Sequence, residues 1–206
     1  MDGVFMKKLI KLILFGVLIC SLLGFGDLLK DKNLLQDNLI RLHVVANSDS
    51  DQDQQIKLQV KDAVVNYLQP IMENFSTKES AMAYVKENLA SLQEVANRAL
   101  DTLGISDRAT VTFQPESFLT RVYETFSLPA GVYDALRIEI GDGEGENWWC
   151  VVFPSLCLPV TGDGFADTAV ASGFSETLTN TLSTQGGYRL RFFFLDCLGR
   201  LENLFF

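Results

Sequence analysis

Hydrophobic and polar residues alternate in the stretch NLIRLHVVA, at residues 38–46. Ile40, Leu42 and Val44 fall on one side of the pattern, while Arg41 and His43 fall on the other. A period of two residues is typical of a β-strand with one face packed and one face open to water. We therefore expect a half-buried strand here.

The apolar spacing changes to that of a helix after this strand. Ser50 and Asp53 resemble a capping box, in which two side chains bond the free amides at a helix start. Pro70 is expected to end this helix, because proline has no amide hydrogen to donate within it. The apolar stripe between these points consists of Ile56, Val60, Ala63, Val64 and Tyr67.

A second helix is predicted between residues 76 and 103. Ser76 and Glu79 form another potential capping box, and Gly104 is a suitable residue to close the helix. The stripe on this helix consists of Val85, Leu89, Leu92, Ala96, Ala99 and Leu103.

The remaining chain is expected to form mainly strands. Gly141, Gly143 and Gly145 predict a hairpin loop between the last two of four successive strands. Small, weakly patterned residues at 160–174 predict a flexible connector, followed by a short helix near 175–184 and a strand at 188–196. The four earlier strands are expected at 109–113, 118–126, 132–140 and 147–153.

Together these elements predict an α+β fold. We expect a single domain with a mainly antiparallel sheet of about five strands packed against two longer helices. An amino-terminal hydrophobic helix is expected to precede this domain. The chain of 206 residues is long enough to bury one good core.

The amino terminus has the pattern of an export segment. Three lysines, at positions 7, 8 and 11, precede an uncharged run from Leu12 to Gly26. A basic start followed by an apolar run is typical of a secretion signal, and a retained membrane anchor remains an alternative. Because lysines stay on the cytoplasmic side, residues 27–206 are expected to be an exported domain.

The exported domain is expected to be strongly acidic. Of 17 basic and 26 acidic side chains, residues 1–26 hold three lysines and Asp2, which leaves 14 and 25 and a net charge of −11. Such a domain repels nucleic acid and anionic lipid. A protein partner is therefore favoured, and no nucleic-acid partner is expected.

Export also permits a disulfide bond. Cys150 and Cys157 enclose a short loop containing Pro154, which makes them the natural pair, while buried thiols, with Cys197 as a third, are the alternative. Their spacing fits no common zinc motif.

No metal or cofactor is expected at the polar motifs. Asp49, Asp51 and Asp53 have the alternate spacing of a calcium loop, but Gln54 and Val60 replace its glycine and its final glutamate. These aspartates are expected to stabilise a helix start. The GDGEG string precedes a strand and carries carboxylates, so it is not expected to bind phosphate, and no small-molecule substrate is predicted.

Two interpretations remain for the functional residues. Cys150, His43 and Asn47 are the types of residue that a cysteine hydrolase uses, and they could form such a site if the thiol and the imidazole meet in space. Trp148 and Trp149 lie side by side on a predicted strand, so their rings point to opposite faces. An exposed tryptophan is a common anchor of protein interfaces, although both rings being buried is the alternative.

Two long segments of the chain are distinctive, IRLHVVANSDSDQDQQIKLQVKDAVVNYLQP and LPAGVYDALRIEIGDGEGENWWCVVFPSLC. Together they resemble the Stage II sporulation protein R family, whose members are exported signalling proteins of endospore-forming bacteria. The resemblance implies a messenger that passes from the forespore into the space between the two cells. There it would activate a membrane-embedded aspartic-type protease that cuts the precursor of sigma-E.

The resemblance therefore implies a ligand and not an enzyme. From chemistry and position, we expect contacts with the protease at His43, Asn47, Asp49, Trp148 and Trp149. The secreted cysteine hydrolase using Cys150 and His43 is the alternative.

Overall fold

The computed structural model describes residues 36–122 and 127–154, together with the single positions 15 and 33. The chain divides into two units, Met1–Leu35 and Gln36–Phe206, and all the helices and strands named below belong to the second. Within the described residues no helix has both the length and the apolar character needed to cross a membrane. The expectations for the export segment, the connector at 160–174 and the elements at 175–184 and 188–196 fall outside this described part.

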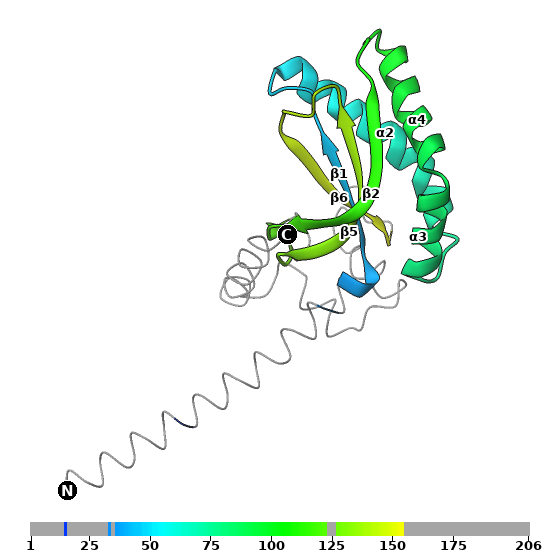
Figure 1. Ribbon diagram of the computed structural model, residues 1–206, viewed down its shortest axis with the longest axis vertical. Helices are drawn as coiled ribbons and strands as arrows, with labels where there is room; N and C mark the ends of the chain where they lie inside the picture. Colours follow the sequence, from blue (N-terminus) through cyan, green and yellow to red (C-terminus); the bar gives the residue numbers. More distant parts are fainter. Residues whose placement is uncertain (1–14, 16–32, 34–35, 123–126, 155–206) are drawn as a thin grey trace, which may run out of the picture. The chain divides into compact units, whose positions relative to one another are not determined.

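The second unit has the predicted α+β class, with helices packed on one face of a sheet (Figure 1). The sheet has the order β2-β5-β1-β6, in which β1 pairs in parallel with β5 and all other pairs are antiparallel. A small separate ladder joins β3 and β4. The strands are β1 (Ile40–Val45), β2 (Ala109–Phe118), β3 (Arg121–Val122), β4 (Ser127–Leu128), β5 (Gly131–Ile140) and β6 (Asn147–Phe153).

The helices begin and end at somewhat different residues from those predicted. The first, α2 (Asp51–Met72), continues past Pro70 and contains it. The second predicted helix is two helices, α3 (Lys78–Glu87) and α4 (Leu89–Thr102), which meet at Asn88. Thr77 caps α3 in place of Ser76, and its side chain accepts a hydrogen bond from the backbone of Ser80.

The capping prediction for α2 is confirmed at Ser50. Its hydroxyl accepts a hydrogen bond from the Asp53 amide at 3.1 Å, which satisfies one of the free donors at the helix start. The return bond of a capping box is absent among these residues, because the Asp53 carboxylate binds Ser48 Oγ at 2.5 Å instead. The Ser48 hydroxyl in turn accepts from the Ser50 amide at 3.2 Å.

The core lies between the sheet and the helices. Alternate residues of β1 point into it, and α2 and α4 supply the opposing layer. Burial of this apolar surface is the main force that holds the two layers together. The most deeply buried members include Ile40, Leu42, Val44, Val60, Val64, Leu92, Ala96, Leu100, Leu136 and Ile138.

The expectation that β1 is half-buried is wrong. All six of its residues are buried, including Arg41 and His43. The strand is central in the sheet, and on its second face the side chains of Arg41 and His43 pack against aromatic rings of the neighbouring strands.

The glycine-containing segment 141–146 is not a hairpin loop. It leaves β5, passes the end of β1 and enters β6, so that β1 lies between the two strands it connects. This path brings it against the β1–α2 junction, where Gly145 N–H donates to Ala46 O at 2.9 Å and Glu144 N–H donates to Asn47 O at 3.2 Å. A Cβ atom at Gly145 would overlap the carbonyl oxygen of Ser48, so only glycine fits there.

Replacing Gly145 therefore tests this close approach. We expect Gly145→Ala to lower the free energy of unfolding by about 2–3 kcal/mol, because the backbone must shift to admit the methyl group. Gly104→Ala is the matched control, since Gly104 has a φ of +71° and no atom within 4 Å of an added Cβ. It should cost only about 1–2 kcal/mol, the strain of the left-handed conformation. Urea denaturation of both variants checks this, and equal losses would contradict it.

Candidate functional site

The side chains of Arg41 and His43 point to the sheet face that lies away from the helices. Directly across the ladder from His43 lies Trp149. The two rings stack with centroids 4.0 Å apart and an interplanar angle of 18°. Phe118 meets the same indole edge-on at 5.0 Å. We call His43, Trp149 and Phe118, together with Glu116 and Arg137, the His43 cluster.

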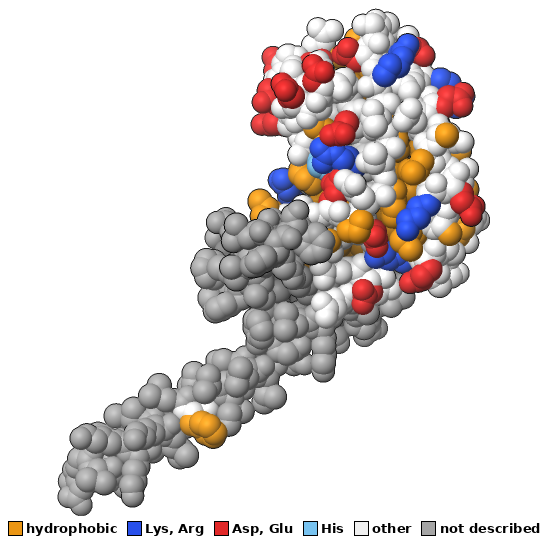
Figure 2. All heavy atoms as spheres, in the orientation of Figure 1, with side chains coloured by type: hydrophobic (Ala, Val, Ile, Leu, Met, Phe, Trp, Pro, Cys, Tyr) orange, Lys and Arg blue, Asp and Glu red, His pale blue; other side chains and the backbone are white. Residues whose placement is uncertain are grey.

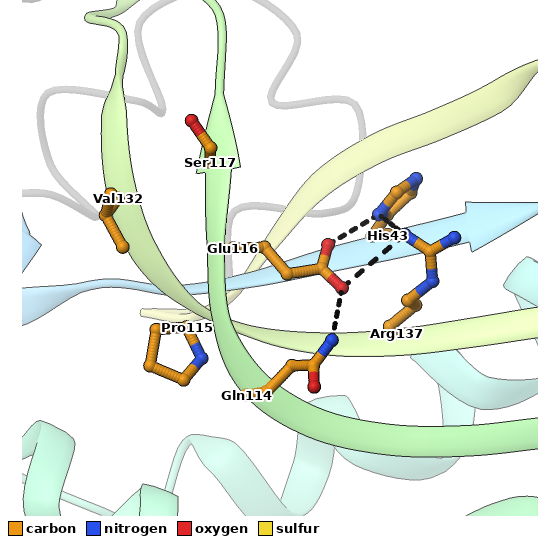
Figure 3. A pocket seen from close by; sticks show the side chains of 7 residues that line it. All are labelled: His43, Gln114, Pro115, Glu116, Ser117, Val132 and Arg137. Atoms are coloured by element: carbon orange, nitrogen blue, oxygen red, sulfur yellow. Dashed lines mark hydrogen bonds and ion pairs between the residues drawn. The ribbon is translucent and has the colours of Figure 1, made fainter. Parts of the chain in front are cut away.

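The polar part of the His43 cluster comes from three neighbouring strands. His43 Nδ1 lies 2.8 Å from Glu116 Oε2 and 3.2 Å from Arg137 Nη1. Because an ionised carboxylate only accepts hydrogen bonds, Nδ1 carries the hydrogen and donates it to Glu116. Figure 3 shows these three side chains, together with Gln114, directed toward one another from β1, β2 and β5.

Glu116 is held in its charged form. Burial alone would favour the neutral acid, but the hydrogen bond from His43 and the electrostatic attraction of His43 and Arg137 outweigh it. The pKa of Glu116 therefore lies below its ordinary value. Arg137 is further bound to Glu139 at 2.6 Å, and its pKa is raised by this and the Glu116 interaction despite the opposing effect of burial.

A pocket of about 330 Å³ adjoins this cluster. The His43 Nε2 atom and the Ser117 hydroxyl are buried and have no hydrogen-bond partner within the part of the chain that the structure describes. The lining residues are His43, Gln114, Pro115, Glu116, Ser117, Val132 and Arg137 (Figure 3).

Arg41, on the same face of the sheet as His43, is surrounded by aromatic rings. Its guanidinium lies 4.0 Å from the ring centroid of Phe118 and 5.2 Å from that of Tyr133. Such contacts stabilise a buried cation through the electron-rich ring faces. The Tyr133 hydroxyl donates to Pro129 O at 2.8 Å, which fixes the ring beneath the guanidinium.

The geometry does not assemble the hydrolase that Cys150 and His43 suggest in the sequence. In the β1–β6 ladder Leu42 pairs with Cys150, whereas His43 pairs with Trp149. Adjacent positions on a strand point to opposite faces, so the sulfur faces the helices and the imidazole faces away from them. A thiol must lie within hydrogen-bond reach of its base to be activated, and here it does not.

Cys150 is disulfide-bonded. The other cysteines of the chain are Cys20, Cys157 and Cys197, and all three lie outside the described residues. Pairing with Cys157 stays a prediction. A disulfide sulfur has no free thiol, which is a second reason why this residue does not serve as a nucleophile in this state.

Asn47 and Asp49 bind the crossing segment 141–146. Asn47 Oδ1 accepts from the Asp142 amide at 2.9 Å, and Asp49 Oδ1 accepts from the Glu146 amide at 2.6 Å. The Ser48 hydroxyl is the largest cause that lowers the pKa of Asp53, and hydrogen bonds with the side chains of Asn47 and Ser50 and with the Ser48 backbone act in the same direction, while burial opposes them. The polar run after β1 thus joins α2 to this segment.

Lys57 completes the same junction from α2. Its side chain is buried, and Nζ donates to Glu146 O at 2.9 Å and also to the Gln54 side chain. Burial lowers the pKa of Lys57, against the opposing attraction of Glu146 and Asp49. The sequence stripe gave no sign of this role, because a lysine on a helix is usually solvated.

The two tryptophans lie on opposite faces, as predicted. Trp149 is half-buried in the His43 cluster, while Trp148 has 37% of its surface exposed. Lys61 Nζ lies 4.7 Å from the Trp148 ring centroid. Of the five expected contact residues, the structure brings His43 and Trp149 together and Asn47 and Asp49 together, and it places Trp148 on the helix side.

Sequence reasoning missed Glu116, Arg137 and Arg41. Glu116 and Arg137 lie 21 residues apart on adjacent strands, so no local motif connects them. The β2–β5 register pairs Arg137 with Thr112 and Glu116 with Tyr133, so the two side chains reach diagonally across the strands to lie 3.5 Å apart. Among residues 36–122 and 127–154, no group of three or more His, Cys, Asp or Glu side chains is arranged to hold a metal ion.

The fold and the site define an α+β domain in which the conspicuous polar residues hold its own strands and loops together. The chain matches the family described as Stage II sporulation protein R (spore_II_R) over residues 36–161. It belongs to the Stage II sporulation protein R family, which supports a role in sporulation.

The similarity extends to a named relative. Stage II sporulation protein R of Bacillus subtilis (strain 168) is 38% identical over 125 residues, which cover 61% of this chain and 56% of that protein. The match thus spans little more than half the length of that relative. No solved structure matches this chain.

The charge on Glu116 predicts a pH-dependent effect of its replacement. A depressed pKa contributes stability that is present above the ordinary Glu value of 4.5 and is lost as the pH falls through the lower folded value. We expect Glu116→Gln to lower the free energy of unfolding by about 1–2 kcal/mol above about pH 5.5, with the loss shrinking toward pH 3.

Urea denaturation between pH 3 and pH 7 measures this difference. Glu94→Gln is the control, because the Glu94 side chain is 68% exposed and its contact with Arg98 is 3.9 Å long. That variant should change stability by less than about 0.5 kcal/mol. A loss for Glu116→Gln that stays constant across this pH range would contradict the assignment.

Proposed function

We propose that this chain is an exported signalling protein of sporulation. In this proposal it crosses from the forespore into the intermembrane space and activates a membrane-embedded aspartic-type protease that processes the sigma-E precursor. The family match over residues 36–161 is the observation on which this depends. The chain acts as a ligand of the protease and does not itself cut the precursor.

Two properties of the chain support export, and a third favours a protein partner. The amino-terminal segment has three lysines followed by the uncharged run Leu12–Gly26, the usual order in an export signal. Cys150 is disulfide-bonded, a state that persists in oxidising compartments outside the cytoplasm. The acidic character of residues 27–206 favours a protein partner over anionic lipid or nucleic acid. Residues 1–26 serve as a cleaved signal or as a membrane anchor.

Activation by a ligand needs no chemistry on the ligand. A protein that binds the active state of the protease more tightly than the inactive state shifts the population toward activity. To raise the active fraction of the protease from about 1% to about 99%, the ligand must bind the active state roughly 10⁴-fold more tightly than the inactive state. The proposed contacts are His43, Asn47, Asp49, Trp148 and Trp149. The exposed Trp148 offers the largest open apolar surface among them.

Reconstitution in cells tests the proposal. We expect cells that produce the protease and the sigma-E precursor to cleave the precursor when the full chain is also produced, and not without it. Immunoblotting measures the ratio of precursor to product. Cleavage that is equal with and without the chain would refute the proposed activation.

A deletion tests the export step separately. A chain that lacks residues 1–26 should be retained in the cytoplasm and should leave the precursor intact, because the proposed contact lies on the other side of the membrane. Restoring export with an unrelated signal peptide is the matched control and should restore cleavage. Full activation by the retained chain would contradict the proposed location.

A further inference from the structure

Three side chains at the start of β6 and on the adjacent part of α2 form a partly open surface. Leu58, Lys61 and Trp148 make up what we call the Trp148 patch. Leu58 and Trp148 are each 37% exposed. Lys61 lies over the indole at 4.7 Å, and Leu58 lies one helical turn before Lys61, on the same side of α2. An apolar surface of this kind is a typical anchor point for a protein partner.

Lys61 does not make the patch cationic. Its Nζ is paired with Asp62 Oδ1 at 2.5 Å, and its side chain is only 14% exposed. The ammonium group of the lysine lies over one part of the indole, and its charge is balanced by the neighbouring carboxylate. The remaining indole surface and Leu58 are open.

The two outer strands of the described sheet, β2 and β6, differ in how far side chains cover their outward backbone groups. On β2, the outward amides of Ala109 and Val111 are bound by the side chains of Asn97 at 2.8 Å and Gln93 at 3.2 Å, both from α4. Pro115 has no amide hydrogen to offer on that strand. Such devices prevent an outer strand from pairing with another chain. At the start of β6, Asp49 and Lys57 bind the backbone of Glu146, but no side chain in the described part of the chain binds the backbone of Asn147 or Trp149.

The backbone at the start of β6 is oriented for such pairing. Ala46 N–H donates to Glu146 O at 3.5 Å, so the groups of Glu146 point toward β1. Backbone groups alternate in direction along an antiparallel strand. The amide and carbonyl groups of Asn147 and Trp149 therefore point away from β1, beside the Trp148 patch.

The surroundings of the patch are acidic. Asp49, Asp62, Glu144 and Glu146 are all exposed, and Figure 2 shows carboxylates gathered over the start of α2 and the adjoining loop. The nearby Lys57 is buried and bonded to Glu146 O. A second copy of this chain would bring like charges together, and anionic lipid would be repelled, whereas a basic segment would be attracted.

We infer that the Trp148 patch binds an extended protein segment that bears Lys or Arg. The segment pairs with the outward backbone groups of Asn147 and Trp149, lays an apolar side chain on Trp148 and Leu58, and places its cation near Glu146. This mode combines strand addition with a side-chain anchor. The inference rests on the proposed function, in which the segment belongs to the extracytoplasmic face of the protease.

Photo-cross-linking locates the contact independently of activation. Full chains carrying Leu58→benzoylphenylalanine or Leu119→benzoylphenylalanine are produced with the protease and irradiated. Leu119 is the matched control, because it is 48% exposed and lies outside the patch. We expect a cross-link to the protease from position 58 and none from position 119. A cross-link from position 119 alone, or from neither position, would overturn the inference.

Variants test the anchor and the strand pairing. Trp148→Ala should raise the amount of chain needed for half-maximal precursor cleavage about 30-fold, as expected for loss of a central aromatic anchor. Leu58→Ser, which removes no packed ring, should act in the same direction, and Leu119→Ala should have no effect. Asn147→Pro removes an outward amide and should weaken activation, whereas Asn147→Ala keeps the amide and should not.

The outcomes separate this inference from the proposed function. If the wild-type chain activates cleavage and the folded Trp148→Ala and Leu58→Ser variants do so equally well, the patch is refuted and the function stands. If the wild-type chain cross-links through position 58 without activating cleavage, the contact is supported and activation is refuted. Cross-linking to a second copy of the chain or to lipid in place of the protease would overturn the inferred partner.

Discussion

The burial of β1 on both faces is the constraint on which the rest of the structure depends. One face contributes Ile40, Leu42 and Val44 to the apolar core against α2 and α4. The other face carries Arg41 and His43, which are buried as well. Buried cations and imidazoles need partners, because removing them from water is costly. Aromatic rings from β2, β5 and β6 and the carboxylate of Glu116 provide those partners.

This constraint also accounts for the path of the chain around β1. β1 lies between β5, to which it is parallel, and β6, to which it is antiparallel. Segment 141–146 joins β5 to β6 and must therefore pass the end of β1. Asn47, Asp49 and Lys57 bind that segment through its backbone. Residues with the appearance of a ligand-binding loop are thus used to join α2 to the sheet. Only glycine fits at position 145, because the two backbones approach closely there.

The contacts of His43 and Cys150 show how these two residues are used in the fold. The histidine is stacked on Trp149 and bonded to Glu116, and the sulfur of Cys150 faces the opposite side of the sheet. These residues contribute to the packing of the domain and not to an assembled catalytic site. In the described part of the chain, the start of β6 has an exposed tryptophan, Trp148, with acidic side chains close by.

Local sequence patterns predicted most of the elements because those patterns record local physics. The alternation in β1, the cap at Ser50, the stripe of α2 and the opposite faces of Trp148 and Trp149 all follow from backbone periodicity. The α+β class follows from the order of the elements. The prediction that Pro70 ends a helix was wrong, because Met72 is buried against the core and α2 extends to include it. The packing of Met72 in the core outweighed the cost of placing a proline within the helix.

The sequence by itself determined the element types, the acidic charge and the family resemblance, because each can be read from neighbouring residues or from long matching segments. Only the tertiary structure decided that Arg41 and His43 are buried, that Glu116 and Arg137 meet them, and that β1 separates β5 from β6. Strand order and register depend on contacts between residues far apart in the chain. No local periodicity encodes those contacts.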